Sequence, residues 1–260
     1  ESVATTSAEV TSKETIKPIE QDEPVGERIV FNRGSTEMYS VKLDGTSEIK
    51  LVESLSRLTN GGCCNAKVSP DATHLTYVSD HNLWVVDLNG KNPKKLTTKG
   101  RAYTNEFQAI EAEVIGWSPT SDKILYWLKS VQGGPDGSYP GTPSNAVEDP
   151  TVRYGIYIYD LKKTEEKFLR ATKVEPEDWQ YVEWPANTNK ALFNDGLLTN
   201  PTTSEYLYAL DVETGNFAKF SNNKYLRLWV GGNQTSVSTD GKLLAWGCGV
   251  VDSVTVVGQT

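Results

Sequence analysis

One short phrase recurs five times along this chain. It begins with a charged or polar residue, continues with three or so apolar residues that include an aromatic one, and then reaches a polar break. Its copies occupy residues 28–32 (RIVFN), 74–78 (HLTYV), 123–127 (KILYW), 190–194 (KALFN) and 242–246 (KLLAW). They begin 46, 49, 67 and 52 residues apart. A period of this size constrains the chain to fold as a series of similar units.

The copy at 63–98 shows what one unit contains. Short apolar strands are predicted at 66–68, 74–79 and 83–88, and a polar outer strand at 94–98. Pro70 presets a turn dihedral and Asp71 can bond its own backbone, so a tight turn separates the first two strands. Four short antiparallel strands per unit predict an all-β fold: a β-propeller of four-stranded blades, with about five blades present and the last incomplete.

The third strand of the unit ends in an aspartate. The pattern is an apolar residue, an aromatic residue, two variable residues, Asp and an apolar residue, and it occurs at 83–88, 156–161 and 207–212. Such an aspartate can accept hydrogen bonds from the amides of the following turn. The first copy departs from the pattern, because Lys42 stands at the aspartate position.

The turns between first and second strands share a further motif: VSPDA at 68–72, WSPTSD at 117–122 and STDGK at 238–242. With the strands that follow them, these turns resemble the repeats of TolB-type propellers, WD-like repeats common in bacterial envelope proteins. The resemblance covers about residues 25–258. It implies a propeller fold and an extracytoplasmic location, in the periplasm or at the cell surface. Ala72 stands where the family usually has glycine, and WPAN at 184–187 is a degenerate copy.

The chain divides into two parts. Residues 1–24 are rich in Ser, Thr and Glu and contain no aromatic residue, so they are predicted to be a disordered linker before a propeller at 25–260. There are five second strands but only four complete pairs of third and fourth strands. The chain is therefore interpreted as part of a larger ring, and a small closed five-bladed ring is the alternative.

Composition bears on partners and on the cysteines. A formal net charge of −8 without a basic patch argues against nucleic acid. No apolar run approaches the ~20 residues of a membrane-spanning helix. The three cysteines are interpreted as buried or free thiols, and a disulfide between Cys248 and either Cys63 or Cys64 is an open alternative.

The alternating direction of the strands predicts at which end of the blades a binding face would lie. In a four-stranded meander, the loops between strands two and three share one end with the connections between blades. The longest segments of this sequence fall at that end: 99–113, 131–152, 172–180, 197–205 and 221–233. Their aromatic residues suit protein contacts and sugar stacking, although packing between adjacent blades is the simpler interpretation.

Aligning the first strands of the blades identifies positions expected to ring the mouth of the central channel. They are Cys64, Glu113, Gln180 and Asn233, and Glu113 with nearby Glu111 would make one side negative. Polar groups bound to water in the channel are the alternative interpretation. The predicted partner-binding set combines channel and aromatic positions: Glu113, Trp179, Gln180, Asn233, Tyr103, Phe107, Tyr225 and Trp229.

Motifs for catalysis are missing from the sequence. It contains no Gly-x-Ser-x-Gly elbow, no His-Glu-x-x-His and no phosphate-binding glycine loop. Of the two histidines, His74 holds the strand-start slot that Lys or Arg holds in the other copies, and His81 lies in a tight turn. No metal-ligand spacing is found, and no cofactor is expected. The chain is predicted not to be an enzyme.

The resulting hypothesis is a non-catalytic extracytoplasmic propeller that binds a protein or peptide partner through its loop-rich face. Two alternatives stay open. The same aromatic residues would suit a glycan. The propeller would also serve as the substrate-gating domain of a prolyl-oligopeptidase-like peptidase.

Overall fold

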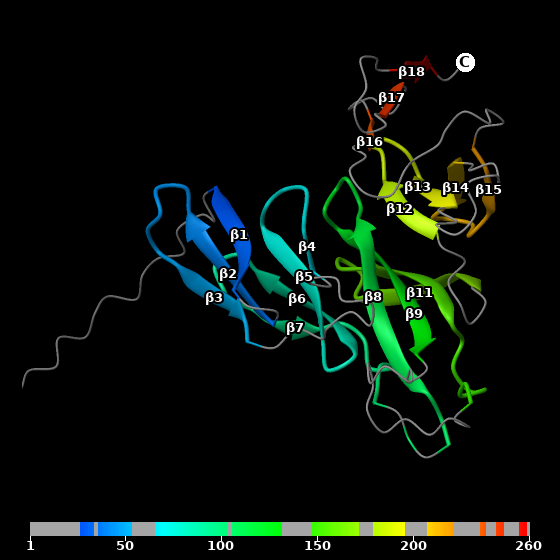
Figure 1. Ribbon diagram of the computed structural model, residues 1–260, viewed down its shortest axis with the longest axis horizontal. Helices are drawn as coiled ribbons and strands as arrows, with labels where there is room; N and C mark the ends of the chain where they lie inside the picture. The colour runs from blue at the N-terminus through cyan, green and yellow to red at the C-terminus, as the bar shows by residue number, and fades with distance from the viewer. Residues whose placement is uncertain are drawn as a thin grey trace, which may run out of the picture.

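The computed structural model describes residues 27–33, 36–53, 66–102, 104, 106–131, 147–171, 179–195, 207–220, 235–237, 243–246 and 255–258. These ranges contain eighteen β-strands and no helix (Figure 1). Accordingly, none of the described segments includes a helix long and apolar enough to cross a membrane. The predicted linker at 1–24 and the three cysteines lie outside the described residues.

The strands form five antiparallel sheets, each an up-and-down meander in chain order, which we number as blades 1 to 5. Blade 1 holds β1 (Arg28–Arg33), β2 (Glu37–Lys42) and β3 (Ile49–Val52). Blade 2 holds β4 (Ala66–Val68), β5 (His74–Ser79), β6 (Asn82–Asp87) and β7 (Lys94–Lys95). Blade 3 holds β8 (Ala109–Trp117), β9 (Lys123–Val131), β10 (Gly155–Asp160) and β11 (Glu165–Ala171).

Blade 4 holds β12 (Trp179–Glu183), β13 (Lys190–Asp195), β14 (Leu207–Asp211) and β15 (Phe217–Lys219), and blade 5 holds β16 (Thr235–Val237), β17 (Leu243–Trp246) and β18 (Thr255–Gly258). Every copy of the recurring phrase thus forms the strand predicted for it: β1, β5, β9, β13 and β17. The all-β architecture of four-stranded propeller-type blades is confirmed. Within the described ranges, blades 1 and 5 have three strands each.

The Ser-Pro turns owe their geometry to the serine side chain. Ser118 Oγ accepts hydrogen bonds from the amides of Lys123 (2.9 Å) and Asp122 (3.2 Å), and it donates to Asp122 Oδ1 at 3.0 Å. Ser69 Oγ does the same in blade 2, where it accepts from the His74 amide at 2.9 Å and donates to Asp71 at 2.6 Å. The motif therefore fixes the turn that joins the first strand to the second.

The aspartate that ends the third strand caps the next turn, as predicted. Asp160 Oδ1 accepts the amides of Lys162 and Lys163, each at 3.0 Å. Asp211 Oδ1 accepts the amide of Thr214 at 2.8 Å. In blade 1, where Lys42 takes the usual aspartate position, Asp44 accepts the Thr46 amide at 2.9 Å instead.

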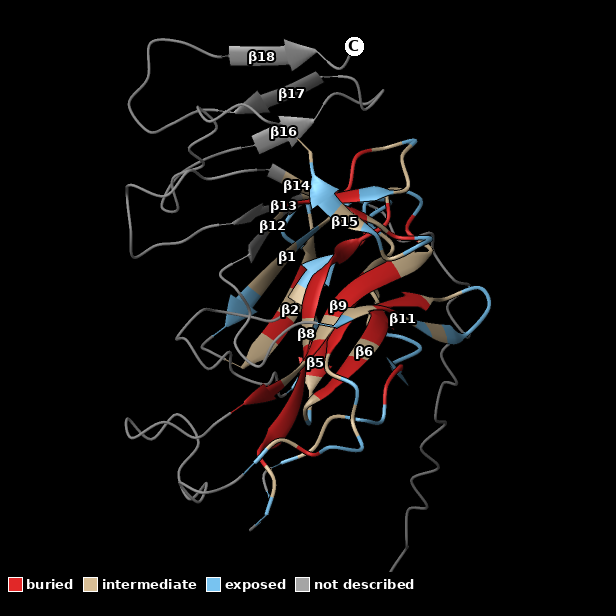
Figure 2. Ribbon diagram, turned by 90° about the vertical axis from the view of Figure 1, so that its right-hand side faces the viewer, coloured by how far each residue is buried: buried red, intermediate tan, exposed pale blue. Residues whose placement is uncertain are grey.

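Strand alternation gives each blade two apolar faces, and consecutive blades pack face to face. Three buried clusters result, one at each joint between blades 1 to 4. The face toward the preceding blade always uses the same two positions of the second strand: Leu75 and Tyr77, Ile124 and Tyr126, Ala191 and Phe193, all with at most 6 % of their surface exposed. Figure 2 shows the buried residues concentrated in blades 2 and 3.

Blade 1 leaves the equivalent positions uncovered in the described part of the chain. Ile29, which corresponds to Leu75, is 51 % exposed, and Phe31, which corresponds to Tyr77, is partly exposed. Phe31 stacks on Tyr39 with ring centroids 5.8 Å apart, and the Arg33 guanidinium lies 4.4 Å from the Tyr39 centroid. A charged side chain thus partly covers this aromatic face.

The joint between blades 3 and 4 depends on a glycine in β8. The β8–β9 register shifts between Val114 and Gly116, and the Tyr181 ring of β12 packs against the glycine. A Cβ atom on Gly116 would lie 2.6 Å from Tyr181 Cζ, closer than van der Waals contact allows. Burial raises the pKa of the Tyr181 hydroxyl above its usual range. The missing side chain therefore makes room for a buried aromatic ring.

We expect Gly116→Ala to destabilise the protein by about 1–3 kcal/mol, the usual cost of overpacking a core. Chemical denaturation followed by circular dichroism would measure the change. In a Tyr181→Ala background the same glycine substitution should cost clearly less, because the clashing ring is gone. Equal costs in the two backgrounds would contradict the packing argument.

Candidate functional site

Two parts of the chain meet at the loop-rich end of blade 3. The connection from blade 2 pairs with β8 through an isolated bridge between Arg101 and Ile110, and it pairs with the segment before β10 through a parallel bridge between Phe107 and Val147. The Gln108 amide also donates to the Val147 carbonyl at 2.9 Å. The structure therefore brings together two of the loops that the alternating direction of the strands placed at one end.

An ion pair and an aromatic contact stabilise this junction. The Arg101 guanidinium lies 2.5 Å from Asp149 Oδ2, and its Cζ lies 5.5 Å from the Phe107 ring centroid. Hydrogen bonds from Thr151 and from Arg101 hold the pKa of the Asp149 carboxyl below its usual range. We call Arg101, Phe107, Val147 and Asp149 the loop platform. Val147 is 57 % exposed there, so the platform presents an apolar side chain to solvent.

Glu113 lies further inside the sheet than the sequence predicted. It was expected where the first strand begins, but β8 begins at Ala109 because Ala109 to Glu113 pair with Val131 to Trp127 of the long β9. Its carboxylate forms an ion pair with Lys129. Nearby Glu111 is buried, with Oε1 3.2 Å from His81 Nδ1. The expected negative side is therefore paired with basic side chains.

For two of the other predicted binding positions, Trp179 and Gln180, the structure describes only the backbone. Trp179 and Gln180 open β12, where they pair with Asp195 and Asn194, and their side chains lie outside the described part. Phe107 belongs to the loop platform. The remaining four positions lie outside the described residues: Tyr103, Tyr225, Trp229 and Asn233.

A histidine in blade 2 has neighbours of the kinds found in hydrolase triads. His74 Nε2 lies 3.3 Å from Asp87 Oδ1, and His74 Nδ1 lies 2.6 Å from the Thr73 hydroxyl. The hydroxyl has one proton, however, and Asp71 Oδ1 accepts it at 2.8 Å. The arrangement is therefore a capped turn, in which the hydroxyl is held by a carboxylate rather than activated by a base.

A pocket of about 480 Å³ opens between blades 3 and 4, at the end opposite the loop platform. Four tight turns surround it, because the first and third turns of each meander share this end. Its lining residues come from both blades: Ser118, Pro119, Thr120, Lys123, Ile158, Asp160, Lys163, Glu165, Lys167, Trp184, Asn187, Thr188, Asn189, Val212 and Glu213. No signal in the sequence pointed to this pocket, because long loops were the signal for a binding face and the pocket is built from short turns.

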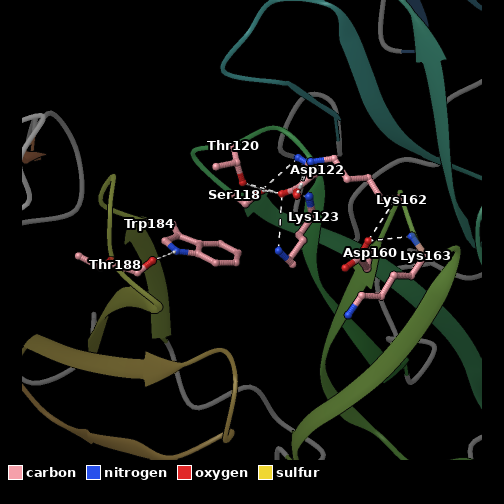
Figure 3. Close-up of polar contacts among 9 residues, drawn as sticks. All are labelled: Ser118, Thr120, Asp122, Lys123, Asp160, Lys162, Lys163, Trp184 and Thr188. Carbon is pink, nitrogen blue, oxygen red and sulfur yellow. Dashed lines mark hydrogen bonds and ion pairs between the residues drawn. The ribbon is translucent and has the colours of Figure 1, made fainter.

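The walls of the pocket are fixed by hydrogen bonds (Figure 3). On the blade 4 side, the Trp184 indole N–H donates to the Thr188 carbonyl at 3.0 Å. On the blade 3 side, the Leu161 amide donates to the Asp122 carbonyl at 2.9 Å, which ties the two turns of that blade together. Turns held in this way present a largely preformed cavity.

Asp122 does not line the pocket itself, but it binds three residues of the blade 3 wall: Ser118, Thr120 and Lys123. Its carboxylate accepts from Thr120 Oγ1 at 2.5 Å, and Lys162 Nζ lies 3.0 Å from Oδ2. Partial burial alone would raise the pKa of this carboxyl, but the hydrogen bonds from Thr120, Lys162 and Ser118 and the charge of Lys123 outweigh it and hold the pKa far below its usual range. Asp122 is therefore ionised wherever the protein is folded at ordinary pH.

Among the residues that the structure describes, no three His, Cys, Asp or Glu side chains are grouped so that they would hold a metal ion.

We expect Asp122→Asn to destabilise the protein at pH 7 by about 1–2 kcal/mol, because the ionised carboxylate accepts charge-assisted bonds. The pKa of Asp122 is lowered by folding, so its contribution is complete above about pH 4, the range of an unfolded carboxyl, and is lost as the pH falls through the lowered pKa. Urea unfolding of both proteins between neutral and acid pH would measure this. If the difference in unfolding free energy between the two proteins stays constant below pH ~4, the assignment is wrong.

Comparisons with known proteins find a family match over part of the chain and solved structures of low sequence identity. Residues 24–130, less than half of the chain, match the family described as the dipeptidyl peptidase IV (DPP IV) N-terminal region. A protein assigned as TolB from Agrobacterium tumefaciens is 15 % identical with a TM-score of 0.47, and the match covers 89 % of this chain and 72 % of that one. A search of curated proteins found no matching relative.

Two further solved structures are similar at the same low level. TolB from Acinetobacter baumannii is 16 % identical with a TM-score of 0.44, and the match covers 88 % of this chain and 48 % of that one. An oligogalacturonate lyase in complex with manganese is 13 % identical with a TM-score of 0.48, over 85 % of this chain and 52 % of that one. The strand topology itself makes the chain an all-β repeat protein with propeller-type blades.

Proposed function

We propose that this chain is a binding module, not an enzyme, and that it binds a protein or peptide partner through the loop-rich end of its blades. The observation that carries the proposal is the loop platform. Two loops distant in sequence are joined there by β-bridges, and the Arg101–Asp149 ion pair holds them beside the exposed Val147. A fixed surface with an aromatic ring, an arginine and an exposed apolar side chain is the composition of a protein contact.

Ion pairs fix the charged side chains near this end, as a preorganised contact surface requires. Glu113 is paired with Lys129, Glu111 lies beside His81, and Arg101 is paired with Asp149. The resemblance to TolB-type repeats also favours a location outside the cytoplasm.

A second candidate function has an observation of its own. The match of residues 24–130 to the N-terminal region of dipeptidyl peptidase IV favours a propeller that gates access to a peptidase domain. The coding sequence downstream of Thr260 tests this candidate. A hydrolase domain with a Gly-x-Ser-x-Gly motif would support it, and a stop codon directly after Thr260 would rule it out.

We expect Arg101→Ala and Phe107→Ala to weaken partner binding by about tenfold or more each, because both side chains build the platform. The partner would be isolated from an extract of the source cells on immobilised protein, identified by mass spectrometry, and then titrated as a pure component.

Glu53→Ala is the matched control, since Glu53 is a highly exposed residue of blade 1. Thermal melts would confirm that all variants are folded. Equal affinities for the wild type and both platform variants would rule out binding at this end. No measurable affinity for the pure partner would show that the chain does not bind it at all.

A further inference from the structure

The pocket between blades 3 and 4 has a chemistry of its own, independent of the loop platform. Its floor is apolar: Ile158, Trp184 and Val212 line it with 6–7 % of their surface exposed. Its volume of about 480 Å³ lies within the usual range of ligand sites, ~300–1,000 Å³. A pocket with a dry floor and a charged rim favours a ligand that has both an apolar and a charged part.

Three lysines line the pocket: Lys123, Lys163 and Lys167, whose Nζ donates to the Glu213 carbonyl. Lys123 is partly buried and forms a long ion pair with Asp122, with Nζ 3.7 Å from Oδ1, whereas Lys162 lies closer to the same carboxylate, 3.0 Å from Oδ2. The Lys163 ammonium makes no ion pair with any described residue, although its backbone amide binds Asp160. The two neighbouring lysines of this turn therefore differ: Lys162 is used by the fold, and Lys163 lines the pocket (Figure 3).

The carboxylates on the rim oppose an anionic ligand only weakly. The amides of Lys162 and Lys163 donate to Asp160 Oδ1 and offset part of its negative charge. Glu165 and Glu213 stand exposed in solvent, where water and salt screen their charge. Lys123 is the less exposed charge, and a partly desolvated ammonium gains more from a carboxylate than exposed carboxylates lose by its approach.

We propose that this pocket binds an acidic peptide segment. An apolar side chain of the peptide lies against Trp184 and Ile158, and a neighbouring carboxylate lies between the ammonium groups of Lys123 and Lys163. The site is separate from the loop platform, so it would give the module a second point of contact at the opposite end of the blades. Because its walls are hydrogen-bonded turns, little ordering accompanies binding.

The experiment titrates the protein with the blocked peptide acetyl-Gly-Phe-Asp-Gly-amide and follows the tryptophan indole N–H signals by NMR. Trp184→Phe identifies the signal of Trp184, whose N–H binds the Thr188 carbonyl beside the pocket. We expect that signal to shift and saturate with a Kd of about 1 mM or below. The Asn analogue acetyl-Gly-Phe-Asn-Gly-amide and the Ala analogue acetyl-Gly-Ala-Asp-Gly-amide should each bind about tenfold more weakly.

Lys163→Met and Lys123→Met should each weaken the Asp peptide by about fivefold or more. The matched control is Lys94→Met, an exposed lysine of β7 far from the pocket, which should leave binding unchanged. Unchanged signals of the other indoles would show that the variants are folded. Lys163 is an exposed turn residue, so its substitution should not disturb folding.

Three results would overturn the proposal. They are no shift of the Trp184 signal at about 10 mM peptide, an affinity for the Asn analogue equal to that for the Asp peptide, or a loss of affinity in Lys94→Met as large as in Lys163→Met. Arg101→Ala and Phe107→Ala should leave this peptide's affinity unchanged. Failure at the pocket and failure at the loop platform can therefore be told apart.

Discussion

Packing of one blade's face on the next is the constraint on which the rest of this structure depends. Each blade is a thin sheet whose two faces are both apolar, so no blade can bury its core alone. The strand with the most contacts to neighbouring blades is β8, the first strand of blade 3. It contacts β4, β5 and β6 of the preceding blade and β12 of the following one. Trp117 of β8 also donates its indole N–H to the Lys67 carbonyl at 2.9 Å. Packing and hydrogen bonding thus join the blades through their first strands.

The turns convert this stack into a scaffold with two different ends. Short turns capped by serine and aspartate keep one end tight, which allows neighbouring blades to enclose a pocket with defined walls. Long connections leave the other end free to vary, and there the Arg101–Asp149 pair provides the fixed contact. The same meander therefore produces a preformed cavity at one end and a loop-built surface at the other.

Much of this fold could be predicted from the sequence, because its signals are local. Strand alternation, the Ser-Pro turns and the aspartate of the third strand each act within a few residues, and each recurs. The pocket could not be predicted in this way, since it brings Lys123 and Trp184 together across a blade joint. The length of β8 was also misjudged: nothing in residues 109–113 shows that they pair with the extended end of β9.

The face of blade 1 that no other described blade covers affects how the protein loses structure. Among the described residues, blade 3 packs on two neighbouring blades and blade 1 on one, so local opening is easier at blade 1 than in blade 3. The exposed Ile29 and the stacked Phe31 and Tyr39 would also attract other apolar surfaces in solution. Arg33 lies over these rings and forms an ion pair with Glu48 at 3.0 Å. This pairing gives the edge a charged cover, which lowers its tendency to aggregate.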